Sequence, residues 1–393
     1  MRLFGVAALA VLSCADAREV SSATPQASSA TLPVEAQPEP PTSSSAKSSP
    51  PVGPMPEPVR LIAGGDVELG RLRGQALLLN PARDDFAPLA PLFASADLRF
   101  ANLESTISDQ KGETQSSWSA LVFTAPPPAA PLLAQAKLDL VSLANNHAWD
   151  YGKPALFETF DRLTAAKVRW VGAGRTLDEA YAPQLLESRG QRLAFVAVTA
   201  IWNQKLEPHP GKQLIADADR ELTLGAVKRA RALGVDRVIL SFHGGDEYVD
   251  QPLPGTRALL IAALDAGADV VLGHHPHVIQ RVEIHDGKPI FYSLGNLLMR
   301  MSTSQPWTEY GMLARLTFEP KGAISAEVCP IRTFGLDVVP LGTDSTRELR
   351  ERFFRVRFGN LLNAGAKVDP ASAVELGPFS EDGCAPLTPR APR

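Results

Sequence analysis

The sequence predicts an α/β fold with a largely parallel β-sheet, and three observations carry this prediction. From Val59 onward, short apolar runs alternate with stretches of helical character, a pattern that indicates βαβ units. Polar residues follow several of these runs at the strand ends, where loops of open α/β sheets converge on one crevice. Further apolar runs between residues 312 and 340 have no helix between them, which indicates a terminal antiparallel ribbon.

The chain starts with a segment that is typical of secretion. Residues 3–12 are apolar and follow Arg2; the run is too short for a stable membrane helix and long enough for a signal-peptide core. Val11-Leu12-Ser13-Cys14 resembles the lipobox of bacterial lipoproteins. We therefore expect a lipoprotein signal peptide over residues 1–14, acylation of Cys14, and an outward-facing lipid anchor in the bacterial cell envelope. An ordinary secretory signal is the alternative.

Composition divides the rest of the chain into three parts. Residues 15–58 are rich in Ser, Pro and Ala with few large apolar residues, so we expect a disordered tether. Residues 59–369 are predicted to form the folded domain, and residues 370–393, again rich in Pro and Ala, a loose C-terminal tail. Cys329 and Cys384 could form a disulfide in an oxidising compartment or remain free thiols, because their spacing proves nothing about pairing.

The predicted elements of the domain alternate along the chain. Strands are predicted at residues 59–63, 98–102, 138–143, 169–171, 193–199, 235–242, 270–272 and 289–293. Helices are predicted at residues 86–94, 129–136, 153–166, 217–233 and 255–266. The ribbon is expected at residues 312–318, 323–331 and 337–340, followed by a charged helix at residues 345–357.

Charge limits the class of partner. The formal net charge of the 393 residues is −4, which argues against a general nucleic-acid binder, since such proteins are usually basic. No segment after the leader approaches the roughly 18 consecutive apolar residues of a membrane span. We therefore expect no nucleic-acid partner, and membrane contact through the lipid anchor alone.

Histidines gather at the predicted strand ends. Gly273-His274-His275-Pro276-His277 follows a buried apolar run, and His147 and His243 follow two others, so five of the seven histidines lie at such positions. A lone histidine is more often a satisfied core or surface residue. Five of them in converging loops predict a metal site, because neutral imidazole is the commonest protein ligand for transition metals.

Oxygen donors follow the other predicted strands. Asp66 lies on a glycine-rich turn, Glu104 closes the run Asn102-Leu103-Glu104, and Asn146 precedes His147. Helix capping and turn chemistry could account for each of them singly. Together with the histidines they form a mixed nitrogen and oxygen donor set, which suits Mn, Fe(II) or Zn.

Six ordered blocks of this sequence resemble the CapA family, named for a protein of poly-γ-glutamate capsule synthesis. The blocks are Gly65-Asp66, Asn102-Leu103-Glu104, the segment 145–152 with its Asn-Asn-His-x-x-Asp-x-Gly pattern, the segment 241–248, the segment 273–277, and Tyr292-Ser293-Leu294-Gly295-Asn296. The resemblance extends over about residues 59 to 300. It implies a calcineurin-like metallophosphoesterase fold: a sandwich of two mixed β-sheets flanked by helices, here with a short C-terminal β-ribbon and helix.

The resemblance also implies a chemistry and its residues. A divalent metal centre, of two ions of Mn, Fe or Zn, would be held by Asp66, Glu104, Asn146, His243, His275 and His277. His147 would be the general acid, with Asp150 beside it as a catalytic residue. The implied function is metal-dependent hydrolysis in the synthesis or processing of an anionic envelope polymer or phosphoester, together with capsule-synthesis proteins. A non-catalytic, metal-assisted polymer-binding or export module is the alternative.

Two departures from the family pattern are visible. Gly244 stands where the family usually has Trp, which removes an aromatic wall beside His243. Val67-Glu68 follows Asp66, so the Asp-x-His opening of ordinary metallophosphoesterases is absent. The first departure bears on substrate preference, and the second alters the first metal position.

Overall fold

The computed structural model describes residues 55–391, except residues 204, 205, 207, 302, 303, 321 and 343–346. For residues 306, 349 and 350 only the backbone is described. The predicted signal peptide, Cys14 and residues 15–54 of the predicted tether lie outside this range. No helix in the described part of the chain is both long and apolar enough to span a bilayer.

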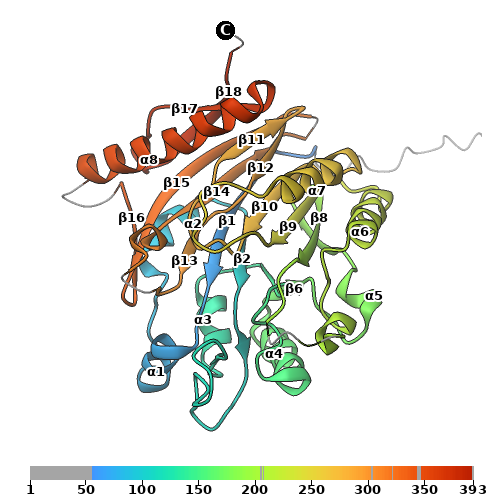
Figure 1. Cartoon of the computed structure of the whole chain (residues 1–393), viewed down its shortest axis with the longest axis vertical. Coiled ribbons are helices and arrows are strands. Elements are labelled where there is room, and N and C mark those ends of the chain that lie inside the picture. Colours follow the sequence, from blue (N-terminus) through green and yellow to red (C-terminus); the bar gives the residue numbers. More distant parts are fainter. Residues whose placement is uncertain are drawn as a thin grey trace, which may run out of the picture. The chain divides into compact units, whose positions relative to one another are not determined.

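One sheet is built around the first strand of the domain (Figure 1). Its order is β17 (Val374–Leu376), β18 (Ala385–Pro389), β15 (Ile324–Phe334), β14 (Tyr310–Phe318), β1 (Val59–Val67), β2 (Leu98–Leu103), β5 (Leu140–Ser142) and β6 (Arg169–Val171). β13 (Asn296–Leu298) also pairs with β1, and β16 (Asp337–Pro340) with β15. The half from β1 to β6 is parallel, and the half from β14 to β17 is antiparallel.

The second sheet is smaller and has a parallel centre. Its order is β11 (Val282–His285), β12 (Lys288–Phe291), β10 (Val270–His274), β9 (Arg237–His243), β8 (Gln191–Thr199) and β7 (Gln184–Ser188). The four strands from β12 to β8 are parallel, and both edge strands are antiparallel. A short pair, β3 (Thr106–Ile107) and β4 (Thr124–Ala125), lies apart from both sheets.

Three apolar cores hold these layers together, and the alternation of side chains along the strands generates them. Between the sheets, Leu61 and Phe100 of the first sheet pack with Phe195, Ile239 and Leu272 of the second. The ring centroids of Phe100 and Phe195 are 5.6 Å apart. Each sheet also buries its outer face, so the two sheets and their helices form a layered sandwich.

Helices cover the outer faces of both sheets. α1 (Arg71–Leu79), α2 (Ala90–Ala94), α3 (Ala129–Gln135) and α4 (Gly152–Ala166) contribute to the core on the outer face of the first sheet. α6 (Arg220–Ala232) and α7 (Pro254–Asp265) cover the second sheet, and the short α5 (Leu177–Ala180) joins the same core. α8 (Arg347–Val368) runs along the β17 and β11 edges (Figure 1) and adds Phe354 and Phe358 to the core between the sheets.

The predicted fold class is confirmed, with differences in detail. The predicted strands and helices all occur, with ends shifted by a few residues, and the ribbon and terminal helix are present. α1, β7 and β11 were not predicted. α8 continues to Val368, beyond the predicted end at residue 357, because Leu361 and Leu362 extend the buried face of Phe354 and Phe358 at helical spacing.

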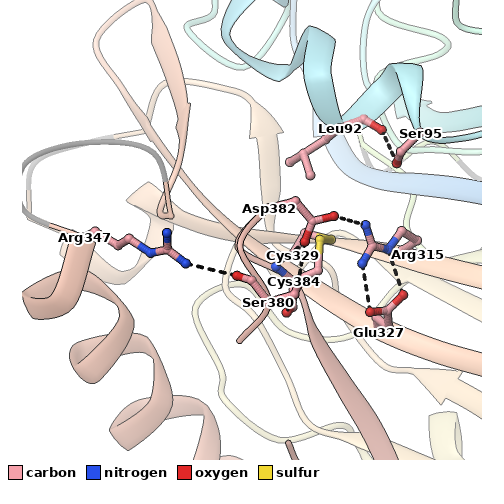
Figure 2. The surroundings of a disulfide bond; sticks show 9 residues. All are labelled: Leu92, Ser95, Arg315, Glu327, Cys329, Arg347, Ser380, Asp382 and Cys384. Atoms are coloured by element: carbon pink, nitrogen blue, oxygen red, sulfur yellow. Dashed lines mark hydrogen bonds and ion pairs between the residues drawn. A yellow bond between two sulfur atoms is a disulfide. The ribbon is translucent and has the colours of Figure 1, made fainter. Parts of the chain in front are cut away.

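The prediction of a loose tail over residues 370–393 is wrong. β17 and β18 pair with each other, and β18 pairs with β15, so the described part of this segment belongs to the first sheet. A disulfide between the buried Cys329 and Cys384 fixes the turn before β18 (Figure 2). Arg315 reinforces the attachment, because it pairs with both Glu327 on β15 and Asp382 in the turn.

Loss of this disulfide is expected to destabilise the domain. The bond closes a loop of 55 residues, and a crosslink of this kind typically contributes about 2–4 kcal/mol to the free energy of unfolding. We expect a Cys329→Ala, Cys384→Ala double variant to have a free energy of unfolding that is lower by this amount, and therefore to unfold at a lower urea concentration. Reductant should shift wild type toward the variant and leave the variant unchanged. Wild type that unfolds identically with and without reductant would contradict the bond.

Two glycines let the ends of the sheets converge on one segment. A Cβ on Gly65 would lie 1.8 Å from the carbonyl oxygen of Gly295, and one on Gly273 would lie 2.1 Å from that of Tyr292. β1 and β10 therefore approach the backbone of residues 292–296 more closely than any side chain allows. This close approach brings the carboxyl ends of the two sheets together.

Gly65→Ala is expected to be severely destabilising. The clash is with backbone, which cannot move without disturbing β1 or the 292–296 segment, so the loss should be about 3 kcal/mol or more in the free energy of unfolding. Gly255→Ala is the matched control, because a Cβ there meets nothing within 4 Å and alanine favours the helix. Urea unfolding of both variants measures the difference. Equal stability of the two variants would refute the packing described.

Candidate metal centre

The carboxyl ends of the parallel strands from both sheets meet at one cluster of polar residues. Asp66 lies near the end of β1 in register with Asn102 at the end of β2, and Glu104 follows β2. On the other sheet His243 ends β9 in register with His274, which ends β10. The six residues predicted as ligands belong to loops or strand ends at this convergence, as expected for open α/β sheets.

Three groups of side chains have ligand atoms close enough to share a cation. In each group these atoms lie within 4.8 Å of one another. The groups are Glu104 with His243 and His275, Asp66 with Glu104 and His277, and Glu247 with His275 and His277. Because Glu104, His275 and His277 each belong to two groups, the described residues offer adjoining positions around a common centre.

Asn102 joins donors from the two sheets. Its side-chain nitrogen donates to Asp66 Oδ1 at 2.9 Å and lies 3.2 Å from His243 Nδ1. A second amide, Asn145, holds Asn102 in place by donating to its oxygen at 3.2 Å. Neither amide was among the predicted site residues, although Asn102 stands in the Asn-Leu-Glu run. Such supporting partners orient the donors around a metal.

The donor set fits a divalent cation. Glu104 Oε1 and His275 Nδ1 are buried and accept or donate no hydrogen bond among the described residues. An unpaired buried carboxylate oxygen costs free energy that a cation would offset. Both histidine nitrogens and carboxylate oxygens face the centre, and this mixture suits Mn, Fe or Zn better than Mg or Ca.

The pKa values of the two buried carboxylates are shifted in opposite directions. Burial raises the pKa of Asp66, but His274 Nδ1 at 3.5 Å and His277 Nδ1 at 3.4 Å outweigh burial and hold that pKa well below its usual range. Burial and then the charge of Asp66 raise the pKa of Glu104 well above its usual range. Two fully buried carboxylates that share a site are unfavourable without added positive charge.

The histidines at the centre favour their neutral form. Burial, followed by the neighbouring His275, holds the pKa of His243 well below its usual range. Burial and the charge of His277 lower the pKa of His275 to about 4. The rings of His243 and His275 have centroids 4.9 Å apart. Neutral imidazole is the form that binds metals, so the surroundings keep both rings in the form that can bind a cation.

Hydrogen bonds select which nitrogen of His277 faces the centre. Asn296 donates its amide to the carbonyl of Thr308 at 2.9 Å, so its oxygen points to His277 Nδ1 at 3.0 Å and accepts from it. His277 Nε2 is left facing Glu104 Oε1, 3.8 Å away. Asn296 therefore orients the His277 ring, as outer partners of metal-binding histidines do.

The backbone of the histidine loop is strained. His275 has φ of 99° and His277 has φ of 57°, a region that residues other than glycine rarely adopt. Each such residue costs on the order of 1–3 kcal/mol and persists where its surroundings hold it. The amide of His275 donates to Asp66 Oδ2 at 3.2 Å, and this contact ties the strained loop to the centre.

His147 and Asp150 form a pair beside the centre. His147 Nδ1 lies 2.8 Å from Asp150 Oδ2, and that oxygen also accepts from the amide of Phe123 at 3.0 Å. The Phe123 ring stacks on His147 with centroids 4.2 Å apart. Asn146 directly precedes His147 in the chain, and its Oδ1 lies 2.7 Å from His243 Nε2. This contact links the pair to the predicted ligands.

The structure adds residues that were not among the six predicted ligands or the predicted catalytic pair. Glu247 belongs to one ligand group but is exposed, and His274 is fully buried against Asp66. Asn203 contacts Asn146 at 3.2 Å and His147 Nδ1 at 3.5 Å. The histidine burst pointed to His274, whereas no sequence signal pointed to Asn203, because it reaches the site from a distant loop.

Phe242 takes the space beside Gly244. A Cβ on Gly244 would lie 2.7 Å from the Phe242 ring and 3.1 Å from Ala200. The Trp that the family usually has at this position would therefore require Phe242 to move. The ring of Phe242 in β9 therefore fills the space that a side chain at position 244 would need.

The family follows from comparison with a family profile that covers most of the folded domain. The sequence profile of the bacterial capsule synthesis protein PGA_cap matches residues 60–301. The chain belongs to this family. The match contains all six blocks named above, so the resemblance predicted from the sequence is confirmed.

Relatives with this domain include two capsule proteins of Bacillus. The chain is 28% identical to the PGA biosynthesis protein CapA of Bacillus subtilis, over 72% of this chain and 74% of the relative. It is 26% identical to the capsule biosynthesis protein CapA of Bacillus anthracis, over 68% of this chain and 66% of the relative, just under two thirds of that length.

A similar solved structure is the calcineurin-like phosphoesterase YfkN of Bacillus subtilis. It has a TM-score of 0.46 and 15% identity, and the similarity covers 79% of this chain and 99% of YfkN.

Proposed function

We propose that this chain is a CapA-like envelope lipoprotein with a metal-dependent hydrolase centre that acts on poly-γ-glutamate or a related anionic polymer. One observation supports it above all: Asp66, Glu104, His243, His275 and His277 form overlapping groups of ligand atoms, and Glu104 Oε1 and His275 Nδ1 are buried there without a hydrogen bond among the described residues. The names of the Bacillus relatives supply the polymer and the capsule-synthesis partners. We retain Asn146 as the sixth ligand, next to His243.

The proposed chemistry divides between the cation and the protein. A divalent cation at the centre would supply Lewis-acid stabilisation of negative charge on a substrate oxygen. Asp66 and Glu104 would hold the cation, and the neutral His243 and His275 would complete the donor set. Burial of all four side chains excludes bulk water, which strengthens each electrostatic interaction.

His147 is proposed as the general acid. Asp150 accepts a hydrogen bond from Nδ1 and Phe123 covers one ring face, so the ring is fixed and Nε2 remains to exchange a proton. A positioned acid of this kind gives the proton to the leaving group as the scissile bond breaks. Asp150 orients the ring in the manner of the carboxylate in a catalytic triad.

The anchor and tether belong to the same proposal. We propose that the leader is cleaved before Cys14. Residues 15–58 then form a tether that places the folded domain outside the membrane; this domain comprises residues 59–369 and the sheet-bound tail. The flexible reach of such a segment lets an anchored enzyme sample polymer near the surface. Metabolic labelling with a fatty acid, lost in Cys14→Ala, tests the anchor.

An assay of turnover separates the hydrolase from a binding module. The full chain, loaded with Mn, is incubated with γ-linked glutamate polymer, and the polymer length is followed by size-exclusion chromatography. The proposal predicts shortening that stops with a chelator and returns with metal. Metal-dependent retention of intact polymer, without shortening, would replace the hydrolase with the binding and export module.

A further inference from the structure

A cavity lined by both charged and apolar residues lies beside α1, outside the proposed ligand groups. It has a volume of about 370 Å³. Its lining includes Glu68, Arg71, Arg73, Gln115 and Arg300. Three of the lining residues are arginines and one is acidic, so the cavity carries an excess of positive charge. Such a cavity favours an anionic ligand.

Arg73 gives independent support for a ligand. Its side chain is 2% exposed, and its Nη1 bonds to Asp85 at 2.7 Å and to the carbonyl of Leu336 at 2.8 Å. Nε and Nη2 of Arg73 have no hydrogen-bond partner among the described residues. A buried charged donor without an acceptor is costly, and an anionic oxygen in the cavity would satisfy it.

Arg71 joins this cavity to the proposed catalytic pair. Its guanidinium carbon lies 4.0 Å from the centroid of the Phe123 ring. That ring stacks on His147 with centroids 4.2 Å apart. Glu68 follows Asp66 by two residues on the same segment. One extended ligand could therefore contact the metal centre and the cavity together.

The backbone at Arg71 is held in an uncommon conformation. Its φ of 48° is in the left-handed region, which costs a residue other than glycine free energy unless neighbours impose it. The amide of Arg71 donates to the Thr114 carbonyl at 2.9 Å, and the Thr114 hydroxyl donates to the Arg71 carbonyl at 2.8 Å. These bonds hold the backbone from which the Arg71 side chain extends, and preorganisation of this kind favours binding.

We propose that this cavity is an anion subsite that holds a carboxylate of the substrate chain while a neighbouring repeat unit occupies the metal centre. The proposal rests on the proposed function, because it assigns a binding position to a second part of the same polymer. Arginine binds carboxylates through charge-assisted, often bidentate hydrogen bonds. The subsite would select polymers over single residues, since only a chain can reach both positions.

Calorimetric titration of the metal-loaded full chain tests this subsite. The probes are free glutamate, a short γ-linked glutamate oligomer and inorganic phosphate, each at constant ionic strength. Arg71→Gln and Arg300→Gln should each weaken oligomer binding about tenfold and leave glutamate binding unchanged, because the lost bond is charge-assisted. Arg60→Gln is the control, since it removes the same charge from an exposed position in β1. Metal content and circular dichroism verify the fold of each variant.

The outcomes separate the subsite from the proposed function. Equal oligomer affinity in wild type and both cavity variants would overturn the subsite. So would arginine-dependent binding of phosphate by a protein that does not bind the oligomer, because the cavity would then take phosphate. Arginine-dependent oligomer binding by a protein that retains no metal would support the subsite, although it would overturn the hydrolase.

Discussion

Removal of the metal by a chelator is expected to lower the thermal stability of this protein by a large amount. Asp66 and Glu104 are both buried within one ligand group, and the raised pKa of Glu104 indicates that two ionised carboxylates there are unfavourable without a cation. A ligand present at a thousandfold excess over its dissociation constant stabilises the folded state by about 4 kcal/mol. Thermal unfolding before and after chelation, with Mn added back, measures this contribution.

Two variants control the chelation experiment. His243→Ala should lower stability in the presence of metal and abolish most of the response to the chelator, because it removes a ligand. His285→Ala changes a histidine on the edge strand β11, 3.8 Å from Asp265 and outside the ligand groups, and should respond like wild type. A wild-type melting curve that is indifferent to both chelator and metal would contradict a metal centre.

Substitution of His147 is expected to remove turnover and leave the metal in place. Loss of a positioned general acid typically lowers the rate by about 10²–10⁴-fold. We expect His147→Gln to show a fall of this size in kcat, with metal content and oligomer affinity equal to those of wild type. Asp150→Asn should also lower kcat, because an amide in place of the carboxylate no longer holds the imidazole in the required tautomer or stabilises its charged form.

Kinetics with a substrate that has a good leaving group tests whether His147 acts as a general acid. Such a leaving group departs without a proton, so the His147→Gln defect should shrink with that substrate if the residue acts as an acid. A purely structural role predicts the same defect with both substrates. Wild-type activity of His147→Gln on the natural polymer would rule out the assignment.

Much of the fold could be predicted because its parallel strands are buried. Runs such as residues 98–102 and 270–272 are short, apolar and followed by polar residues, which is the pattern of a strand covered on both faces. The edge strands β7 and β11 are half polar and carry no such signal. The N-cap residue of α1 is Gly70, which has no side chain to cap the helix, so its start is not marked in the sequence.

The C-terminal tail shows where composition misleads. Residues 370–393 are rich in Pro and Ala, yet Cys384 and the pairing of β18 with β15 attach this segment to the sheet. These contacts join residues far apart in the chain, and neither periodicity nor composition reports such pairs. Which cysteines pair is equally invisible without the fold.

The site was predicted from residue types at strand ends, and its supporting residues were not. Asp66, Glu104 and the histidines stand out because they follow apolar runs. Asn102 and Asn296 matter through the partners they orient, and Arg73 through the acceptors it lacks. Such roles depend on three-dimensional contacts, so they become visible only once the two sheets are placed together.

Mass spectrometry of the purified full chain measures directly whether the proposed centre holds a metal. His243→Ala and His275→Ala are measured beside wild type, with His285→Ala as the control. We expect one or two equivalents of Mn, Fe or Zn in wild type and in the control, and a clear reduction in both ligand variants. Wild-type protein that holds no metal, even after reconstitution, would contradict the proposed centre.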